Sequence, residues 1–122
     1  METGKTSTFP LGVDLIELNK AKFFYRSHKQ RLNSLFSGKE LSYIRKSKKP
    51  YESLGVLLAA KEAAFKALPP SETGIADFRN IEILTNSKDG FQCRLAKDKR
   101  ETKLKFSVFK NQKVVVVRCA GI

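Results

Sequence analysis

Two acidic side chains, Asp14 and Glu62, stand in apolar surroundings, and Lys66 follows the second of them. Asp14 falls within residues 11–18, which alternate as in a strand, and it shares its expected face with apolar neighbours. Glu62 lies within residues 54–68, which are mostly Leu, Ala and Phe, and Lys66 is one helical turn further along. Carboxylates without sulfur or imidazole neighbours suit Mg²⁺, which takes one or two protein carboxylates plus waters and substrate phosphates. Lys66 could hold a phosphate as a point charge.

These residues also have interpretations that involve no chemistry. Asp14 could be a turn or edge residue, because Asp is disfavoured within strands. A buried pair of Glu62 and Lys66 would explain the helix without a metal, since a carboxylate on an enclosed helix needs a partner. The spacing alone leaves both alternatives open.

The stretch Leu54–Leu68 predicts the central helix of the chain. It is rich in Ala and Leu, has no β-branched run, and ends at two prolines. Its large side chains form one stripe at about 100° per residue, and its other faces carry mostly Ala and Gly, so we expect burial nearly all round. The stripe consists of Leu54, Leu57, Leu58, Phe65 and Leu68.

The remaining pattern predicts an α+β protein, in which an N-terminal strand and helices pack on an antiparallel sheet. Ser37 and Glu40 have the spacing of a capping box that starts a helix, and Asn19 is the expected N-cap of an earlier one. Val114–Val117 is typical of a strand covered on both faces. Helices are expected at 19–26, 28–36 and 37–48, and later strands at 79–85, 91–95, 103–109 and 113–119.

Connections and boundaries follow from polar and turn-forming residues. Residues 1–10 are expected to be a flexible lead-in, and residues 11–122 a single domain. Residues 69–75 are an expected loop, 86–90 an expected hairpin turn, and 97–102 a charged connection.

The charge balance is the strongest signal of the composition. The chain of 122 residues carries 24 Lys and Arg against 12 Asp and Glu, a formal net charge of +12. A field of this sign attracts polyanions, which include nucleic acid, a nucleotide-like cofactor and an acidic protein. A solvated basic face is the alternative. The basic residues gather in 20–31, 45–49 and 97–105.

Other features exclude several classes of protein. No apolar run reaches membrane-spanning length, and the first ten residues lack the apolar core of a signal peptide. Cys93 and Cys119 fit no metal spacing and are expected to be reduced, buried thiols of a cytoplasmic protein. His28 has no nearby ligand or nucleophile in sequence, and we expect it at the surface.

Several segments together resemble the holo-acyl-carrier-protein synthases, the small single-domain members of the 4′-phosphopantetheinyl transferases. The pairing of Gly-x-Asp with Lys-Glu-Ala at this separation carries most of the specificity, and the resemblance covers roughly residues 11–120. The matching segments are Gly12-Val-Asp-Leu15 with Ile16-Glu17, Phe36-Ser-x-x-Glu40, Ala59-Ala-Lys-Glu-Ala63 with Lys66-Ala67, and Ile81-Glu-Ile83.

The resemblance implies the 4′-phosphopantetheinyl transferase fold and a Mg²⁺-dependent reaction. Such an enzyme moves phosphopantetheine from coenzyme A to a serine of an acyl carrier protein and releases adenosine 3′,5′-bisphosphate. Asp14 and Glu62 would hold Mg²⁺ against the coenzyme A diphosphate. Glu62 and Lys66 are the implied catalytic residues, because Glu62 could orient or deprotonate the serine through a water. Lys66, Lys61 and Lys110 are the implied coenzyme A-binding residues.

The resemblance also implies partners and an assembly. The partner would be a strongly acidic acyl carrier protein, as in fatty acid biosynthesis, which would dock on the basic first helices. Family members form trimers with active sites between subunits, so a homotrimer in the cytoplasm, without a membrane, is expected. The chain departs from the family pattern at Leu57, where Arg is common, at Lys110, where His is usual, and in the loop 69–74.

Two other functions compete with transfer. One is a non-catalytic homologue that binds acidic carrier proteins or coenzyme A without turnover. The other is a basic nucleic-acid-binding module, against which the absence of an aromatic–glycine surface motif argues.

Overall fold

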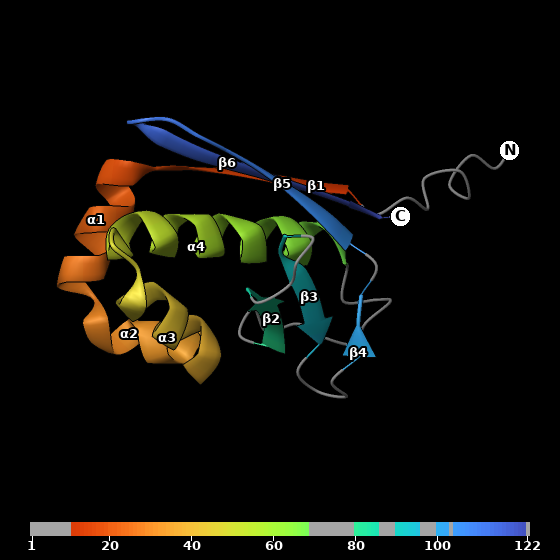
Figure 1. Cartoon of the computed structure of the whole chain (residues 1–122), viewed down its shortest axis with the longest axis horizontal. Coiled ribbons are helices and arrows are strands. Elements are labelled where there is room, and N and C mark those ends of the chain that lie inside the picture. The colour runs from red at the N-terminus through yellow and green to blue at the C-terminus, as the bar shows by residue number, and fades with distance from the viewer. Residues whose placement is uncertain (1–10, 69–79, 86–89, 96–99, 103, 122) are drawn as a thin grey trace, which may run out of the picture.

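The computed structural model describes residues 11–68, 80–85, 90–95, 100–102 and 104–121, and Figure 1 shows their arrangement. An N-terminal strand leads into four helices, and strands make up the rest of the described chain. The elements are β1 (Leu11–Glu17), α1 (Leu18–Ser27), α2 (Lys29–Leu35), α3 (Gly38–Lys46), α4 (Pro50–Ala67), β2 (Ile81–Leu84), β3 (Gln92–Leu95), β4 (Arg100–Glu101), β5 (Leu104–Lys110) and β6 (Val114–Gly121).

The strands form two antiparallel sheets with the orders β1-β6-β5 and β2-β3-β4. The first strand therefore pairs with the last, and Asp14 lies opposite Val117. A tight turn joins β5 to β6, where Asn111 Oδ1 accepts hydrogen bonds from the amides of Lys113 and Val114 at 2.7 and 2.9 Å. The predicted α+β class is confirmed.

Helix α4 is the centre of the molecule. It lies between the β1-β6-β5 sheet on one side and α3 with the β2-β3 hairpin on the other (Figure 1). Its alanines are closed off from solvent, and Ala59, Ala60, Ala63 and Ala64 are each 0% exposed. The predicted burial nearly all round is therefore confirmed, and Lys66 is the exposed exception within residues 54–68. The helix begins at Pro50, earlier than predicted, because proline is well suited to a first helical turn.

The capping box of α3 is present and extends into a buried network. The Ser37 hydroxyl accepts from the Glu40 amide at 3.2 Å, and Glu40 Oε1 accepts from the Ser37 amide at 2.8 Å. The same Oε1 accepts from Lys61 Nζ at 2.9 Å, while Oε2 accepts from the Ile83 amide at 2.8 Å. One carboxylate thus joins α3 to α4 and β2.

Some local expectations were wrong. Helix α1 begins at Leu18 after Glu17, without a side-chain cap, so Asn19 is inside the helix. His28 is half-buried between α1 and α2, where it stacks on Phe24 with ring centroids 5.1 Å apart. The expected connection 97–102 contains the short strand β4. Such details depend on packing that local sequence does not specify.

The β1-β6-β5 sheet buries one face only. Val115 and Val117 of β6 are 0% exposed, whereas Val114 and Val116 on the other face are half-buried. The expectation that residues 114–117 are covered on both faces is therefore not met within one chain. Leu11, Val13, Leu15 and Phe109 leave 47 to 70% of their surface exposed on that outer side.

Other expected segments, namely residues 1–10, 69–75 and 86–89, lie outside the described residues. Among the described helices, none combines the length and apolar character needed to span a bilayer. Cys93 and Cys119 are buried and free, as expected.

Candidate functional site

The site is built where β1 crosses α4, and Gly12 makes that crossing possible. A Cβ placed on Gly12 would lie 1.9 Å from the backbone oxygen of Ala63, which no side chain can tolerate. The bare glycine lets the strand backbone rest directly on the helix at the turn that carries Glu62. Because side chains alternate along a strand, Asp14 faces the helix as Gly12 does.

Asp14 and Lys66 form an ion pair across this crossing. Lys66 Nζ lies 3.0 Å from Asp14 Oδ1 and also donates to the backbone oxygen of Val13 at 3.1 Å. The Asp14 side chain is 22% exposed and that of Lys66 is 52% exposed. The alternative of a Glu62–Lys66 pair is replaced by this contact, which draws the lysine to the strand.

The charges of Asp14 and Lys66 both influence the pKa of Glu62. Burial raises the pKa of the Glu62 carboxyl above its ordinary value, the negative charge of Asp14 raises it further, and Lys66 lowers it. This influence of the Asp14 charge on Glu62 places the two carboxylates in one electrostatic site. The carboxylates of Asp14 and Glu62 are therefore held near each other, together with the Lys66 ammonium.

This arrangement fits a magnesium ion. A divalent cation would relieve the repulsion between Asp14 and Glu62, and Mg²⁺ needs only one or two protein carboxylates because waters and phosphates complete its coordination. The described residues contain no cluster of three or more His, Cys, Asp or Glu side chains that could hold a metal. With two carboxylates, the site suits a hard cation whose other ligands are waters and a substrate phosphate.

Lys61, which the resemblance assigned to coenzyme A, lies in the interior instead. Its side chain is 0% exposed, and its ammonium pairs with Glu40 at 2.9 Å. Burial lowers the Lys61 pKa and the charge of Glu40 opposes that shift. A direct contact with a ligand from solvent does not fit this placement, and we assign Lys61 a structural role.

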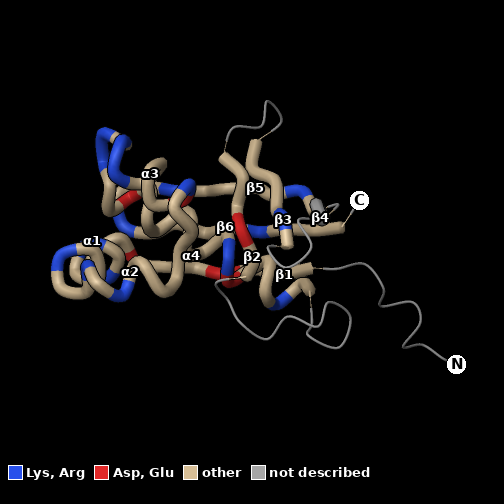
Figure 2. The backbone as a smooth tube through the Cα atoms, turned by 90° about the horizontal axis from the view of Figure 1, so that it is seen from below, with Lys and Arg blue, Asp and Glu red and all other residues tan. Residues whose placement is uncertain are grey.

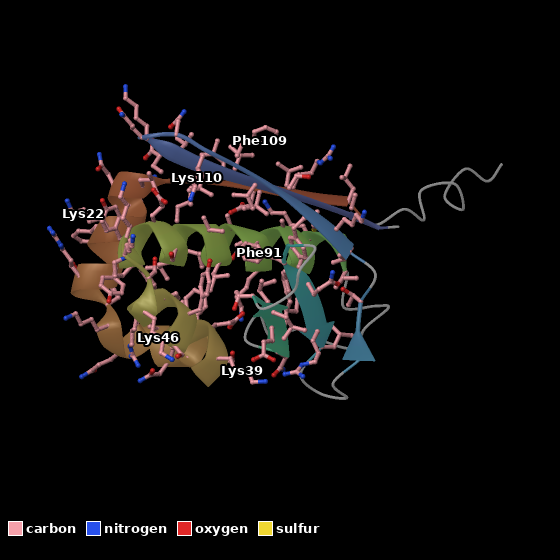
Figure 3. All side chains as sticks on the ribbon, in the orientation of Figure 1. Lys22, Lys39, Lys46, Phe91, Phe109 and Lys110 are labelled. Carbon is pink, nitrogen blue, oxygen red and sulfur yellow. The ribbon has the colours of Figure 1, made fainter. Side chains whose placement is uncertain are left out.

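Lys110 lies at the other end of α4 from the acids. Its ammonium pairs with Glu52 Oε1 at 3.0 Å, and Glu52 precedes Glu62 by about ten residues, or roughly 15 Å along the helix axis. Figure 3 shows Lys110 and Lys22 toward this end. A hollow of about 940 Å³ opens here, lined in part by Lys22, Lys49, Glu52, Lys110 and Lys113.

The structure therefore brings Asp14, Glu62 and Lys66 together and separates Lys61 and Lys110 from them. Sequence reasoning did not identify Glu52 as the partner of Lys110, and no spacing rule links residues so far apart. Leu57, where the resembled family commonly has Arg, is fully buried in the core.

Together the fold and site define a small α+β protein that presents two carboxylates and a lysine at a strand–helix crossing. A family profile described as the 4′-phosphopantetheinyl transferase superfamily matches residues 10–119, and the chain belongs to that family. Within it, the chain is of the holo-[acyl-carrier-protein] synthase type, which places it among the phosphopantetheinyl transferase enzymes.

Named relatives support this membership. The holo-[acyl-carrier-protein] synthase of Chlamydia caviae is 37% identical over 66% of this chain and 67% of that protein. The Carboxydothermus hydrogenoformans protein of the same name is 29% identical over 88% of this chain and 93% of its own length. A structure named as the Chronobacterium ammoniagenes ACPS–CoA complex matches with a TM-score of 0.71 and 22% identity, over 92% of this chain and 95% of that one. The structural match shows the shared fold.

Proposed function

We propose that the protein transfers 4′-phosphopantetheine from coenzyme A to a serine of an acyl carrier protein and releases adenosine 3′,5′-bisphosphate. The observation that carries this proposal is the meeting of Asp14, Glu62 and Lys66 where β1 crosses α4. Family membership and relatives named holo-[acyl-carrier-protein] synthase support the same reaction.

Asp14 and Glu62 are the proposed magnesium ligands. Bound Mg²⁺ would supply positive charge to the diphosphate oxygens, where negative charge develops in phosphoryl transfer. Lys66 would bind a phosphate oxygen from the same side. The serine oxygen forms a bond to the phosphorus that bears pantetheine, and the bond to the adenosine-side phosphate breaks.

Glu62 is also the proposed proton acceptor. Its carboxylate would lie beside the metal-bound waters, from where it could accept the serine proton through a water. Asp14 keeps the Lys66 ammonium within the site. The proposed phosphate ligand, Lys66, and the proposed base, Glu62, therefore lie one turn apart on α4.

The basic helices are the proposed docking surface for the carrier protein. Figure 2 shows blue segments on α1, α2 and α3, and Phe23 of α1 is 64% exposed among these charges. An acidic protein would be steered to this surface, and an exposed aromatic side chain could anchor it.

A homotrimer with sites between subunits is the proposed assembly. Phe109 lies on the side of the β1-β6-β5 sheet away from α4 (Figure 3), and an exposed apolar face of this kind is typical of an interface. Lys110 cannot reach the Asp14 end of its own α4 across roughly 15 Å. It could contact coenzyme A bound at a neighbouring subunit. A cytoplasmic location is consistent with the free buried cysteines.

The transfer assay tests the proposal directly. Incubation with coenzyme A, Mg²⁺ and an apo acyl carrier protein should increase the carrier mass by one phosphopantetheine. Asp14→Ala and Glu62→Ala should abolish the gain, whereas Glu17→Ala, which changes an exposed carboxylate on the same strand, should keep it. An undiminished rate in either site variant would remove the metal assignment. Coenzyme A binding without any gain by the wild-type protein would identify a non-catalytic binder, which Leu57 and Lys110 make worth testing.

A further inference from the structure

Lys66 is the cation that pairs with Asp14 in the structure. Its ammonium lies 3.0 Å from Asp14 Oδ1, and a second hydrogen bond to the Val13 oxygen at 3.1 Å holds it there. A carboxylate that already pairs with an ammonium group is a weaker ligand for a second cation, because the two positive charges repel each other. Without any ligand, the lysine and a divalent cation therefore oppose each other.

The charges of the site give the sign of this effect. Asp14, Glu62 and Lys66 together carry a net charge of about −1, and they would carry about −2 without the lysine. A divalent cation is attracted more strongly by the site without the lysine than by the site that contains it. The Lys66 side chain is 52% exposed, so a phosphate group that arrives from solvent can reach it.

We infer that Lys66 is a built-in counter-cation that weakens divalent-cation binding until a diphosphate ligand takes up its charge. This inference rests on the proposed function, because it assumes that Asp14 and Glu62 bind the metal. Its consequence is cooperativity: the diphosphate and the metal bind better together than either does alone, and part of that coupling passes through Lys66. The lysine would thus disfavour loading of the site by metal without substrate.

The test measures cation binding rather than catalysis. Mn²⁺ binding would be followed by electron paramagnetic resonance and Mg²⁺ binding by calorimetry, with and without coenzyme A and without carrier protein. Lys66→Met should raise the affinity for the cation in the absence of coenzyme A by on the order of tenfold, as expected for charges about 5 Å apart in a largely aqueous setting. Lys66→Arg keeps the charge and should bind the cation as weakly as the wild type.

The coupling gives the second readout. Coenzyme A should strengthen cation binding by a larger factor in the wild type than in Lys66→Met. A purely structural lysine would produce the opposite pattern, since its loss would loosen Asp14 and weaken the cation while leaving the coupling unchanged. The inference would be overturned by that pattern. It would also be overturned if the wild type and Lys66→Met bound the cation equally well, or if neither bound it.

Asp14→Asn separates this inference from the proposed function. Loss of cation binding in Asp14→Asn supports the metal assignment whatever Lys66→Met does. Unchanged cation binding in Asp14→Asn would refute the metal assignment, and the counter-cation role with it. Circular dichroism of each variant would check that the fold is retained.

Discussion

Substitution of Gly12 should separate strand β1 from helix α4 and disable the site without touching any charged group. The new Cβ of Gly12→Ala would lie 1.9 Å from Ala63 O and 2.8 Å from Ala63 C, both backbone atoms that cannot turn aside. Overpacking of a core typically costs about 1–3 kcal/mol, and a backbone clash of this depth belongs at or above the upper end. We expect a loss of about 3 kcal/mol in the free energy of unfolding.

The value of kcat/KM should fall even at temperatures where Gly12→Ala is fully folded, because Asp14 lies on the displaced strand. Urea unfolding followed by circular dichroism gives the stability, and the transfer assay gives kcat/KM at a temperature where the variant is folded. Gly55→Ala is the matched control: this glycine is also buried, but its added Cβ would meet the nearest atom at an ordinary 3.4 Å. It should gain up to about 1 kcal/mol from helix propensity. A Gly12→Ala protein with wild-type stability and activity would refute the reasoning.

Three further outcomes can be checked. Glu62→Gln should stabilise the protein at about pH 7. The pKa of the Glu62 carboxyl is raised in the folded state, so the stability of the wild type falls as pH rises above the ordinary glutamate range. Urea unfolding should show that the gain vanishes at about pH 4, where the glutamate is largely protonated in both states. Lys61→Met should lower the free energy of unfolding by about 3–5 kcal/mol by leaving Glu40 as an unpaired buried charge, and Glu40→Gln in the same chain should restore part of it. Leu15→Glu with Phe109→Glu should convert a trimer to monomers in sedimentation velocity, and a wild-type monomer would contradict the proposed assembly.

Local patterns were sufficient for several elements. Ser37 and Glu40 predicted the start of α3 because both capping hydrogen bonds form within one turn. The Ala-rich composition of residues 54–68 predicted a buried helix, since helix propensity and apolar surface agree there. Alternation in β1 predicted that Asp14 shares a face with Ile16, and the structure shows both less exposed than Leu11, Val13 and Leu15, because the side-chain period of a strand is two.

Patterns failed where a partner is remote in sequence. The sequence drew attention to Glu62 as the enclosed charge of α4, but Lys61 is the one that is fully buried. Its partner is Glu40 of α3, and the Ile83 amide of β2 donates to the same carboxylate. The pairing of Lys110 with Glu52 was likewise not predictable, since the two residues meet only after the β5–β6 hairpin packs near the start of α4. Such contacts depend on the relative placement of whole elements.

From the amino-acid sequence alone one could predict where several elements begin and which residues share a face of their element, because capping, propensity and periodicity act over a few neighbouring positions. Only the tertiary structure decided which charges meet. Asp14 and Lys66 are 52 positions apart in sequence, and they touch because Gly12 lets the strand lie directly on the helix. The physical reason is that an ion pair needs atoms within about 4 Å, a distance set by the packing of backbones and not by sequence spacing.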